Sequence, residues 1–239
     1  MYKKISHNIV EEHYAEPRSA SRPQASSLNQ LNDGSLGLHD SLPSYVMNET
    51  SLNFRMDARS LWAKYTWGLL NYGISLNGSL PSTDLVEARV IKNAIAIGDF
   101  MTPYYGVTTG ERVAKLLAGI GQVGIDVVKA TKEHESLSTL MSMWETLIGQ
   151  LAELFNEINP NNWPESLISD YFLNLTKYWT KQIIARDNKD EVADEAAIEH
   201  LYKVVVIGFS NSVPSHKISS LSDAFSRGII AQFPALFAE

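Results

Sequence analysis

The chain has 239 residues, of which 44% are hydrophobic, and it carries a formal net charge of -7. This hydrophobic content is sufficient for one sizeable core. The acidic balance argues against a non-specific nucleic-acid binder, because such proteins use a basic excess to neutralise phosphates. The absence of cysteine excludes disulfides, cysteine-type zinc sites and thiol nucleophiles.

The sequence has no recognisable membrane or secretion signal. Its longest apolar run, Val204–Phe209, is far shorter than the about 20 residues that a membrane-spanning helix needs. The start, Met1–Lys4, is not followed by the apolar stretch of a signal peptide. We therefore expect no membrane span, and a location in the cytoplasm or within a particle such as a virion.

Residues 1–53 are rich in Ser, Asn and Pro and lack a sustained apolar period. This composition predicts an N-terminal arm that is extended or disordered when it is alone in water. Its spaced apolar residues are typical of a segment that becomes ordered along a partner surface. An ordinary flexible terminus is the alternative. The spaced apolar residues are Ile5, Ile9, Val10, Leu28, Leu31, Leu36, Leu38, Leu42, Tyr45 and Val46.

Residues 54–239 are expected to form an all-α, antiparallel multi-helix bundle of seven helices. The first three are expected at about 57–76, from after Thr83 to about 101, and from 108 onward. Asp57 is the expected N-cap of the first helix. Pro103 is expected to end the second, because the residue before a proline disfavours helical geometry. The Thr108-x-x-Glu111 pattern predicts a capping box that starts the third.

The fourth helix has the clearest apolar stripe, with steps of three and four residues from Leu137 to Ile158. Asn159-Pro160 is expected to end it. The fifth is expected to begin at about Pro164, since proline is favoured at the first helical position.

The sixth helix is expected at about 190–209 and the seventh at about 217–233, before Pro234. The run Val204–Ile207 has strand propensity, but the sequence offers no partner strands. Short connections between long helices predict that consecutive helices lie antiparallel.

Gly119-Ile120-Gly121-Gln122-Val123-Gly124 matches the G-x-G-x-x-G pattern of dinucleotide-binding sites. Such a site requires the glycines between a strand and a helix. Here they lie within a helical apolar stripe, so we interpret them as small residues at close helix contacts.

Two ligand-binding alternatives stay open. A metal site would use Asp223 with Glu195, Glu199 or Asp170, although the acidic residues of the sixth helix are typical of a solvated surface. No histidine follows a glutamate by three residues, as di-iron bundles require. A small-molecule site would use an aromatic pocket, although aromatic residues at helical spacing are more often core. The pocket residues would be Trp62, Tyr65, Trp144 and Tyr171.

Residues 60–234 resemble a family of uncharacterised bacterial helical-bundle proteins. The most specific matches are Pro-Tyr-Tyr-Gly and the C-terminal Gly-Ile-Ile-x-Gln-Phe-Pro. The residues that carry the resemblance are Leu61-Trp62, Leu80-Pro81, Asn93, Ile97-Gly98, Pro103-Tyr104-Tyr105-Gly106, Leu116-Leu117, Trp144, Ile158-Asn159-Pro160, Leu173-x-Leu175-Thr176, Asp223 and Gly228-Ile229-Ile230-x-Gln232-Phe233-Pro234.

The resemblance implies a set of inward polar residues that looks like a metal site. This chain departs from that set nearly everywhere, because Asp223 alone keeps a carboxylate. A single carboxylate does not supply the several N and O ligands that a transition metal needs. The corresponding positions hold Tyr65, Ile120, Gly149, Tyr171-Phe172 and Asp223.

The sequence therefore predicts a non-enzymatic structural or assembly protein, with a helical body and an arm that orders on partner subunits. A minor component of a viral shell or a similar particle fits this prediction. We assign no catalytic, cofactor-binding or metal-binding residues, and we expect protein subunits as partners rather than nucleic acid. The alternative is a metal- or small-molecule-binding bundle, with or without enzyme activity.

Overall fold

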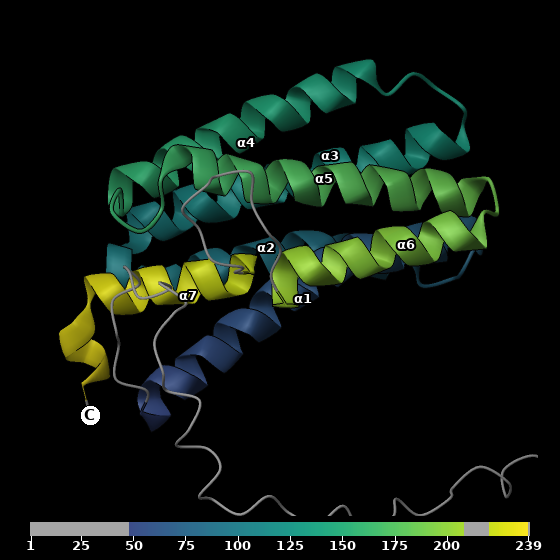
Figure 1. The fold of residues 1–239 in the computed structure, drawn as a ribbon. Coiled ribbons are helices and arrows are strands. Elements are labelled where there is room, and N and C mark those ends of the chain that lie inside the picture. Colours follow the sequence, from purple (N-terminus) through teal and green to yellow (C-terminus); the bar gives the residue numbers. More distant parts are fainter. Residues whose placement is uncertain (1–47, 208–219, 239) are drawn as a thin grey trace, which may run out of the picture. The chain divides into compact units, whose positions relative to one another are not determined.

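A computed structural model describes residues 48–207 and 220–238 (Figure 1). The described residues contain seven α-helices and no strand, which confirms the all-α bundle. Of the expected arm, residues 1–47 lie outside the described part of the chain. The helices are α1 Glu49–Asn77, α2 Thr83–Tyr105, α3 Val107–Lys132, α4 Ser138–Ile158, α5 Glu165–Asp187, α6 Glu191–Tyr202 and α7 Leu221–Gln232.

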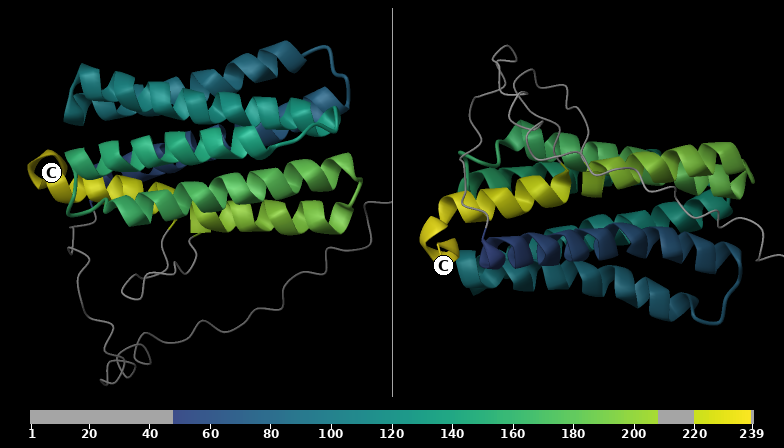
Figure 2. Two further views of the ribbon diagram at one scale, coloured as in Figure 1. Left: turned by 90° about the horizontal axis from the view of Figure 1, so that it is seen from above. Right: turned by 60° about the horizontal axis from the view of Figure 1, so that its bottom comes forward.

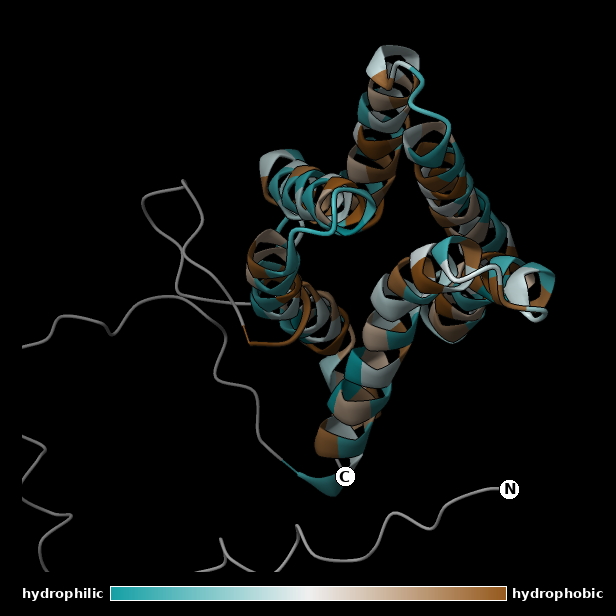
Figure 3. Ribbon diagram, turned by 90° about the vertical axis from the view of Figure 1, so that its right-hand side faces the viewer, coloured by the Kyte–Doolittle hydropathy of each residue, from teal (hydrophilic) through white to brown (hydrophobic). Residues whose placement is uncertain are grey.

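Consecutive helices from α1 to α6 pack side by side, and α7 packs on α1 (Figure 2). The short connections make neighbours such as α2 and α3 antiparallel, as the sequence predicts. Seen from one end of the bundle in Figure 3, individual helices carry both hydrophobic and hydrophilic residues. The hydrophobic faces build one core, to which all seven helices contribute.

Helix α1 begins earlier than the sequence predicts. Its N-cap is Asn48, whose Oδ1 accepts a hydrogen bond from the Ser51 N–H at 2.8 Å, so Asp57 is not the cap. Residues 49–53, expected in the arm, form the first turns of this helix. Buried Phe54 stacks on Phe100 at 4.9 Å, and such tertiary packing extends a helix beyond its local signals.

The boundary between α2 and α3 also differs from the prediction. Helix α2 continues through Pro103 to Tyr105, and Gly106, with φ of 82°, makes the turn. Pro103 removes one backbone hydrogen bond from the last turn of α2. Tyr104 and Tyr105 in that turn contact Phe233, and these aromatic contacts offset the loss. No side chain caps α3, so the expected box at Thr108 does not form.

The predicted bounds of α4 are confirmed at its C-terminus, where Asn159 is the cap. Pro164 caps α5 rather than occupying its first position. Helix α6 ends at Tyr202 and is followed directly by η2, a π-helical turn of residues Lys203–Ile207. The valine-rich run is therefore helical and not a strand.

Helix α7 begins at Leu221, where the Ser220 Oγ accepts a hydrogen bond from the Asp223 N–H at 3.2 Å. It ends at Gln232, and the short 3₁₀ helix η3, Pro234–Phe237, follows it. The expected helical residues 208–209 and 217–219 lie outside the described part of the chain.

The glycines of the G-x-G-x-x-G pattern lie in the middle of α3, which confirms their interpretation as helix contacts. A Cβ added at Gly124 would lie 2.6 Å from Leu69 Cδ2 of α1. One added at Gly121 would lie 3.1 Å from Val90 Cγ1 of α2. The missing side chains thus let neighbouring helices approach α3 closely, and there is no strand-to-helix turn here for a dinucleotide.

Helices α2 and α3 also lie in close contact at Gly98 and Gly110. A Cβ added at Gly98 would lie 2.4 Å from the carbonyl oxygen of Gly110. One added at Gly110 would lie 2.7 Å from the carbonyl oxygen of Gly98. Backbone therefore meets backbone at this crossing, and there is no room for a methyl group on either side.

Candidate functional site

The four aromatic residues that could have lined a ligand pocket lie in the core. Trp62, Tyr65, Trp144 and Tyr171 are all at most 2% exposed. The Tyr65 hydroxyl donates to the Leu117 carbonyl at 2.9 Å, and burial raises the pKa of this phenol above its usual range. The Trp144 indole N–H donates to the Ile120 carbonyl at 2.8 Å. These polar groups therefore serve internal contacts between helices.

The core continues through edge-to-face contacts around Trp62. Its ring centroid lies 5.9 Å from that of Phe172 and 5.3 Å from that of Phe225. Such contacts contribute about 0.5–1.5 kcal/mol per pair beyond the burial of area. Positions 65, 120, 171 and 172, where the resemblance implies inward polar groups, are thus occupied by fully buried packing residues.

The acidic residues of the metal alternative are not brought together. In the described part of the chain, no three His, Asp or Glu side chains form a group that could hold a metal ion. Glu199 is exposed and binds Lys203 at 2.6 Å, and this hydrogen bond and charge lower the pKa of its carboxyl. Glu195 is exposed on the same helix, whereas Asp170 lies on α5 and Asp223 on α7.

Residues from separate motifs of the resemblance meet in one hydrogen-bond network at the ends of α2, α4 and α7. The Tyr105 hydroxyl donates to Gln232 Oε1 at 2.7 Å, and Asn159 Nδ2 donates to the Gly228 carbonyl at 2.9 Å. Gln232 Nε2 donates to the Ile158 carbonyl at 2.9 Å. The network satisfies carbonyls near helix ends, so these residues have a structural role.

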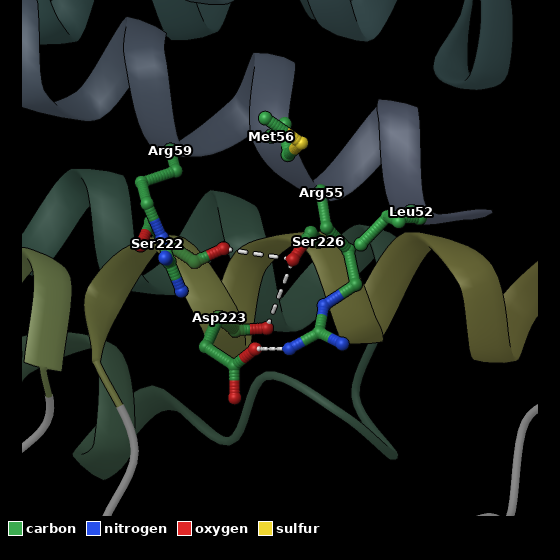
Figure 4. Close-up of a pocket in the computed structure, with 7 residues that line it drawn as sticks. All are labelled: Leu52, Arg55, Met56, Arg59, Ser222, Asp223 and Ser226. Carbon is green, nitrogen blue, oxygen red and sulfur yellow. Dashed lines mark hydrogen bonds and ion pairs between the residues drawn. The ribbon is translucent and has the colours of Figure 1, made fainter. Parts of the chain in front are cut away.

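The candidate site is a pocket of about 110 Å³ between α1 and α7 (Figure 4). Figure 4 shows the side chains of Arg55 and Arg59 reaching from α1 toward α7. Helical spacing places all of the α1 lining residues on one side of that helix. The pocket is lined by Leu52, Arg55, Met56, Arg59, Ser222, Asp223 and Ser226.

Asp223 is the charged centre of the pocket floor. Its Oδ1 accepts a hydrogen bond from Arg55, and its Oδ2 lies 2.9 Å from Arg227 Nε. The carboxylate is 14% exposed and lies in the first turn of α7, where the helix dipole favours negative charge. Because both oxygens bind arginines, Asp223 locks α7 onto α1 instead of offering a metal ligand.

The serine hydroxyls of the pocket are committed to the backbone. Ser222 Oγ donates to the Val205 carbonyl at 2.7 Å, and Ser226 Oγ donates to the Ser222 carbonyl at 2.9 Å. The donors that face a ligand are therefore the guanidinium groups. Arg59 is exposed and forms no ion pair with another described residue.

Comparisons with protein-family models, curated proteins and solved structures found no match for this chain. None of the helices in residues 48–207 and 220–238 is long and apolar enough to cross a membrane.

The sequence prediction missed the arginines of this site. Arg55 and Arg59 are four residues apart and alternate with Leu52 and Met56, a spacing that defines one helix face. This signal was available from the sequence. A predicted helix start at Asp57 hides this face, because Leu52, Arg55 and Met56 then lie before the helix.

We expect Asp223→Asn to lower the free energy of unfolding by about 1–2 kcal/mol, since it removes the negative charge that two partly buried arginines bind. Arg55 and Arg227 are 19% and 29% exposed, so solvent screens only part of the loss. Urea denaturation measures the change. Glu157→Gln, at the exposed pair with Arg112, is the matched control and should cost about 0.5 kcal/mol or less. Equal losses in both variants would contradict a structural role for Asp223.

Proposed function

We propose that this protein is a non-enzymatic structural or assembly protein. The observation that carries the proposal is the interior of the bundle. Tyr65, Ile120, Tyr171 and Phe172 fill the positions at which the resemblance implies polar ligands, and all four are 0% exposed. A bundle whose interior is used for packing is suited to act as a rigid body.

The N-terminal region supports the same function. Residues 1–47 carry spaced apolar residues in a polar sequence, the pattern of segments that bind along a surface. In this proposal they bind neighbouring protein subunits while the bundle supplies the body. A minor position in a viral shell or a similar particle is the proposed setting.

The boundary of α1 shows where the chain should be shortened to test this function. Asn48 caps α1, and its Nδ2 donates to the Phe237 carbonyl at 2.6 Å, which ties the start of the bundle to its last turn. A chain that begins at Phe54 would lose both contacts. A chain that begins at Asn48 keeps them, and it is the better comparison with the full chain.

Light scattering on a sizing column should give a defined oligomer for the full chain and a monomer for residues 48–239. Circular dichroism and the melting temperature should show that both are folded, because the core lies within the shorter chain. Two identical compact monomers would contradict assembly through residues 1–47. An oligomer of unchanged size in the shorter chain would place the assembly contacts wholly in the bundle.

A further inference from the structure

Helix α5 presents a line of apolar and cationic side chains to solvent. Leu173 and Ile184 are 43% and 39% exposed, and the exposed Lys177 and Lys181 lie between them. The four residues follow one another at intervals of three or four, which places them on one face of the helix. We call Leu173, Lys177, Lys181 and Ile184 the α5 stripe. It offers a cationic centre between two apolar ends.

The ring of Tyr178 positions both lysines of the α5 stripe. Lys177 Nζ lies 5.7 Å and Lys181 Nζ lies 5.4 Å from the centroid of this ring, which attracts cations through its π-electrons. Helix α6 packs beside α5 (Figure 1), and its His200 stacks on the same ring at 4.4 Å. The two ammonium groups are therefore held near one ring while their side chains stay exposed.

Acids of α5 itself do not neutralise these lysines. Residues 173–185 contain no Asp or Glu. The flanking acids of the helix, Asp170 and Asp187, lie about 9–11 Å along the axis from the nearer lysine. This separation is about the Debye length at physiological salt, so most of their effect is screened.

Acids on the flanking helices are either bound by other cations or form no ion pair with the two lysines of the stripe. Glu199 of α6 binds Lys203 at 2.6 Å, and Asp194 of α6 binds Arg186 at 3.0 Å. Glu145 of α4 is exposed and forms no ion pair within residues 48–207 and 220–238. The stripe thus keeps its two positive charges at neutral pH.

The N-terminal residues include a segment of complementary character. Residues 9–16 read Ile-Val-Glu-Glu-His-Tyr-Ala-Glu, with three glutamates and neither lysine nor arginine. We call them the acidic segment. Apolar and acidic residues adjoin in it, just as apolar and cationic residues adjoin in the α5 stripe. The cations of residues 1–47 all lie outside it, at Lys3, Lys4, Arg18 and Arg22.

We propose that the acidic segment of one copy binds the α5 stripe of a second copy of this chain. The proposal rests on the assembly function above and names the two parts that meet. The glutamates of the segment face Lys177 and Lys181, and its Ile9 and Val10 contact an apolar end of the stripe. The contact forms without breaking an ion pair of the bundle, because neither lysine is engaged in one within the described ranges.

The chain between the acidic segment and α1 is long enough for this contact. Residues 17–47 connect the two and span at most about 100 Å when fully extended. Helix α5 has 23 residues and is thus about 35 Å long, so a neighbouring copy is within reach. The contact joins different parts of the same chain and is heterologous. Its repetition produces a ring when the rotation closes and an open filament when it does not.

Charge reversal in the full chain tests the proposal. One double variant carries Lys177→Glu and Lys181→Glu, and the other carries Glu11→Lys and Glu12→Lys. Each should weaken self-association about tenfold at low salt, because like charges then face one another. Sedimentation velocity over a concentration series measures the change.

Matched controls reverse two charges of the same sign elsewhere in the chain. Lys92→Glu with Lys115→Glu changes exposed lysines of α2 and α3. Asp33→Lys with Asp40→Lys changes acids of residues 1–47 outside the acidic segment. Both controls should leave association unchanged, and circular dichroism verifies that every variant is folded.

Restoration of the contact separates this pairing from a general effect of charge. The variant that carries all four substitutions should recover association, since opposite charges meet again. An equimolar mixture of the two double variants should recover it as well. An oligomer that neither reversal weakens, or one that the combined variant fails to restore, would overturn this pairing and leave the assembly function intact. A full chain that stays monomeric at every concentration and salt would overturn both.

Discussion

Replacing Gly98 with alanine is expected to lower the free energy of unfolding by about 3 kcal/mol. The added Cβ would lie 2.4 Å from the Gly110 carbonyl oxygen and 2.7 Å from the Ala114 Cβ. The first of these contacts is with backbone, which cannot move aside as the end of a flexible side chain can. Helices α2 and α3 must therefore separate along their crossing, and overpacking of this kind costs about 1–3 kcal/mol or more.

The helix propensity that alanine gains over glycine at position 98 is smaller than the cost of this clash. Alanine is favoured over glycine within a helix by up to about 1 kcal/mol, which does not offset the clash. The matched control is Gly149→Ala on α4, where an added Cβ meets no atom within 4 Å. This control should raise the free energy of unfolding by up to about 1 kcal/mol. Urea denaturation of both variants measures the contrast, and a stabilised Gly98→Ala would refute the close crossing.

Gly228→Ala should cost about 2–3 kcal/mol at a contact between α7 and Trp163. The added Cβ would lie 2.2 Å from Trp163 Nε1, on a fully buried ring. The ring stacks on Phe225 at 5.6 Å, and its N–H donates to the Ala224 carbonyl at 3.1 Å. A displaced indole loses that hydrogen bond as well as its packing, so two penalties add at this site.

Gly73→Ala is the control for this second variant, since Gly73 is also a buried helical glycine but an added Cβ meets nothing within 4 Å. It should be neutral or stabilising by up to about 1 kcal/mol. Tryptophan fluorescence should shift in Gly228→Ala and not in Gly73→Ala, because only the first displaces an indole. Similar stabilities for the two variants would show that the Trp163 contact is looser than the structure indicates.

The candidate site was predictable only in fragments. The sequence marks Asp223 as a candidate residue, but its role as the partner of Arg55 does not follow from the sequence. The two residues are 168 positions apart, and nothing local links them. The same holds for Tyr105 and Gln232, which appear in separate motifs and meet in one hydrogen bond. Contacts between distant segments depend on how the helices pack, and a single sequence does not record that packing.

Helix boundaries were predicted well where local chemistry decides them and poorly where packing does. Asn159 ends α4 as expected, because its cap position and the following proline act within a few residues. Pro103 does not end α2, since Tyr104 and Tyr105 hold the last turn against Phe233. The early start of α1 has a similar cause in the contact between Phe54 and Phe100.

The sequence by itself determined the helical class and the faces that enter the core, as the stripe of α4 illustrates with Trp144, Ile148 and Leu151. Periodicity acts along one helix, so it can be detected without knowledge of its neighbours. The tertiary structure decided which glycines touch, which charges pair and which arginines line a pocket. Those properties depend on contacts between helices. The interaction energy of such contacts is set by the distance between atoms in space, and not by how far apart the residues are in the sequence.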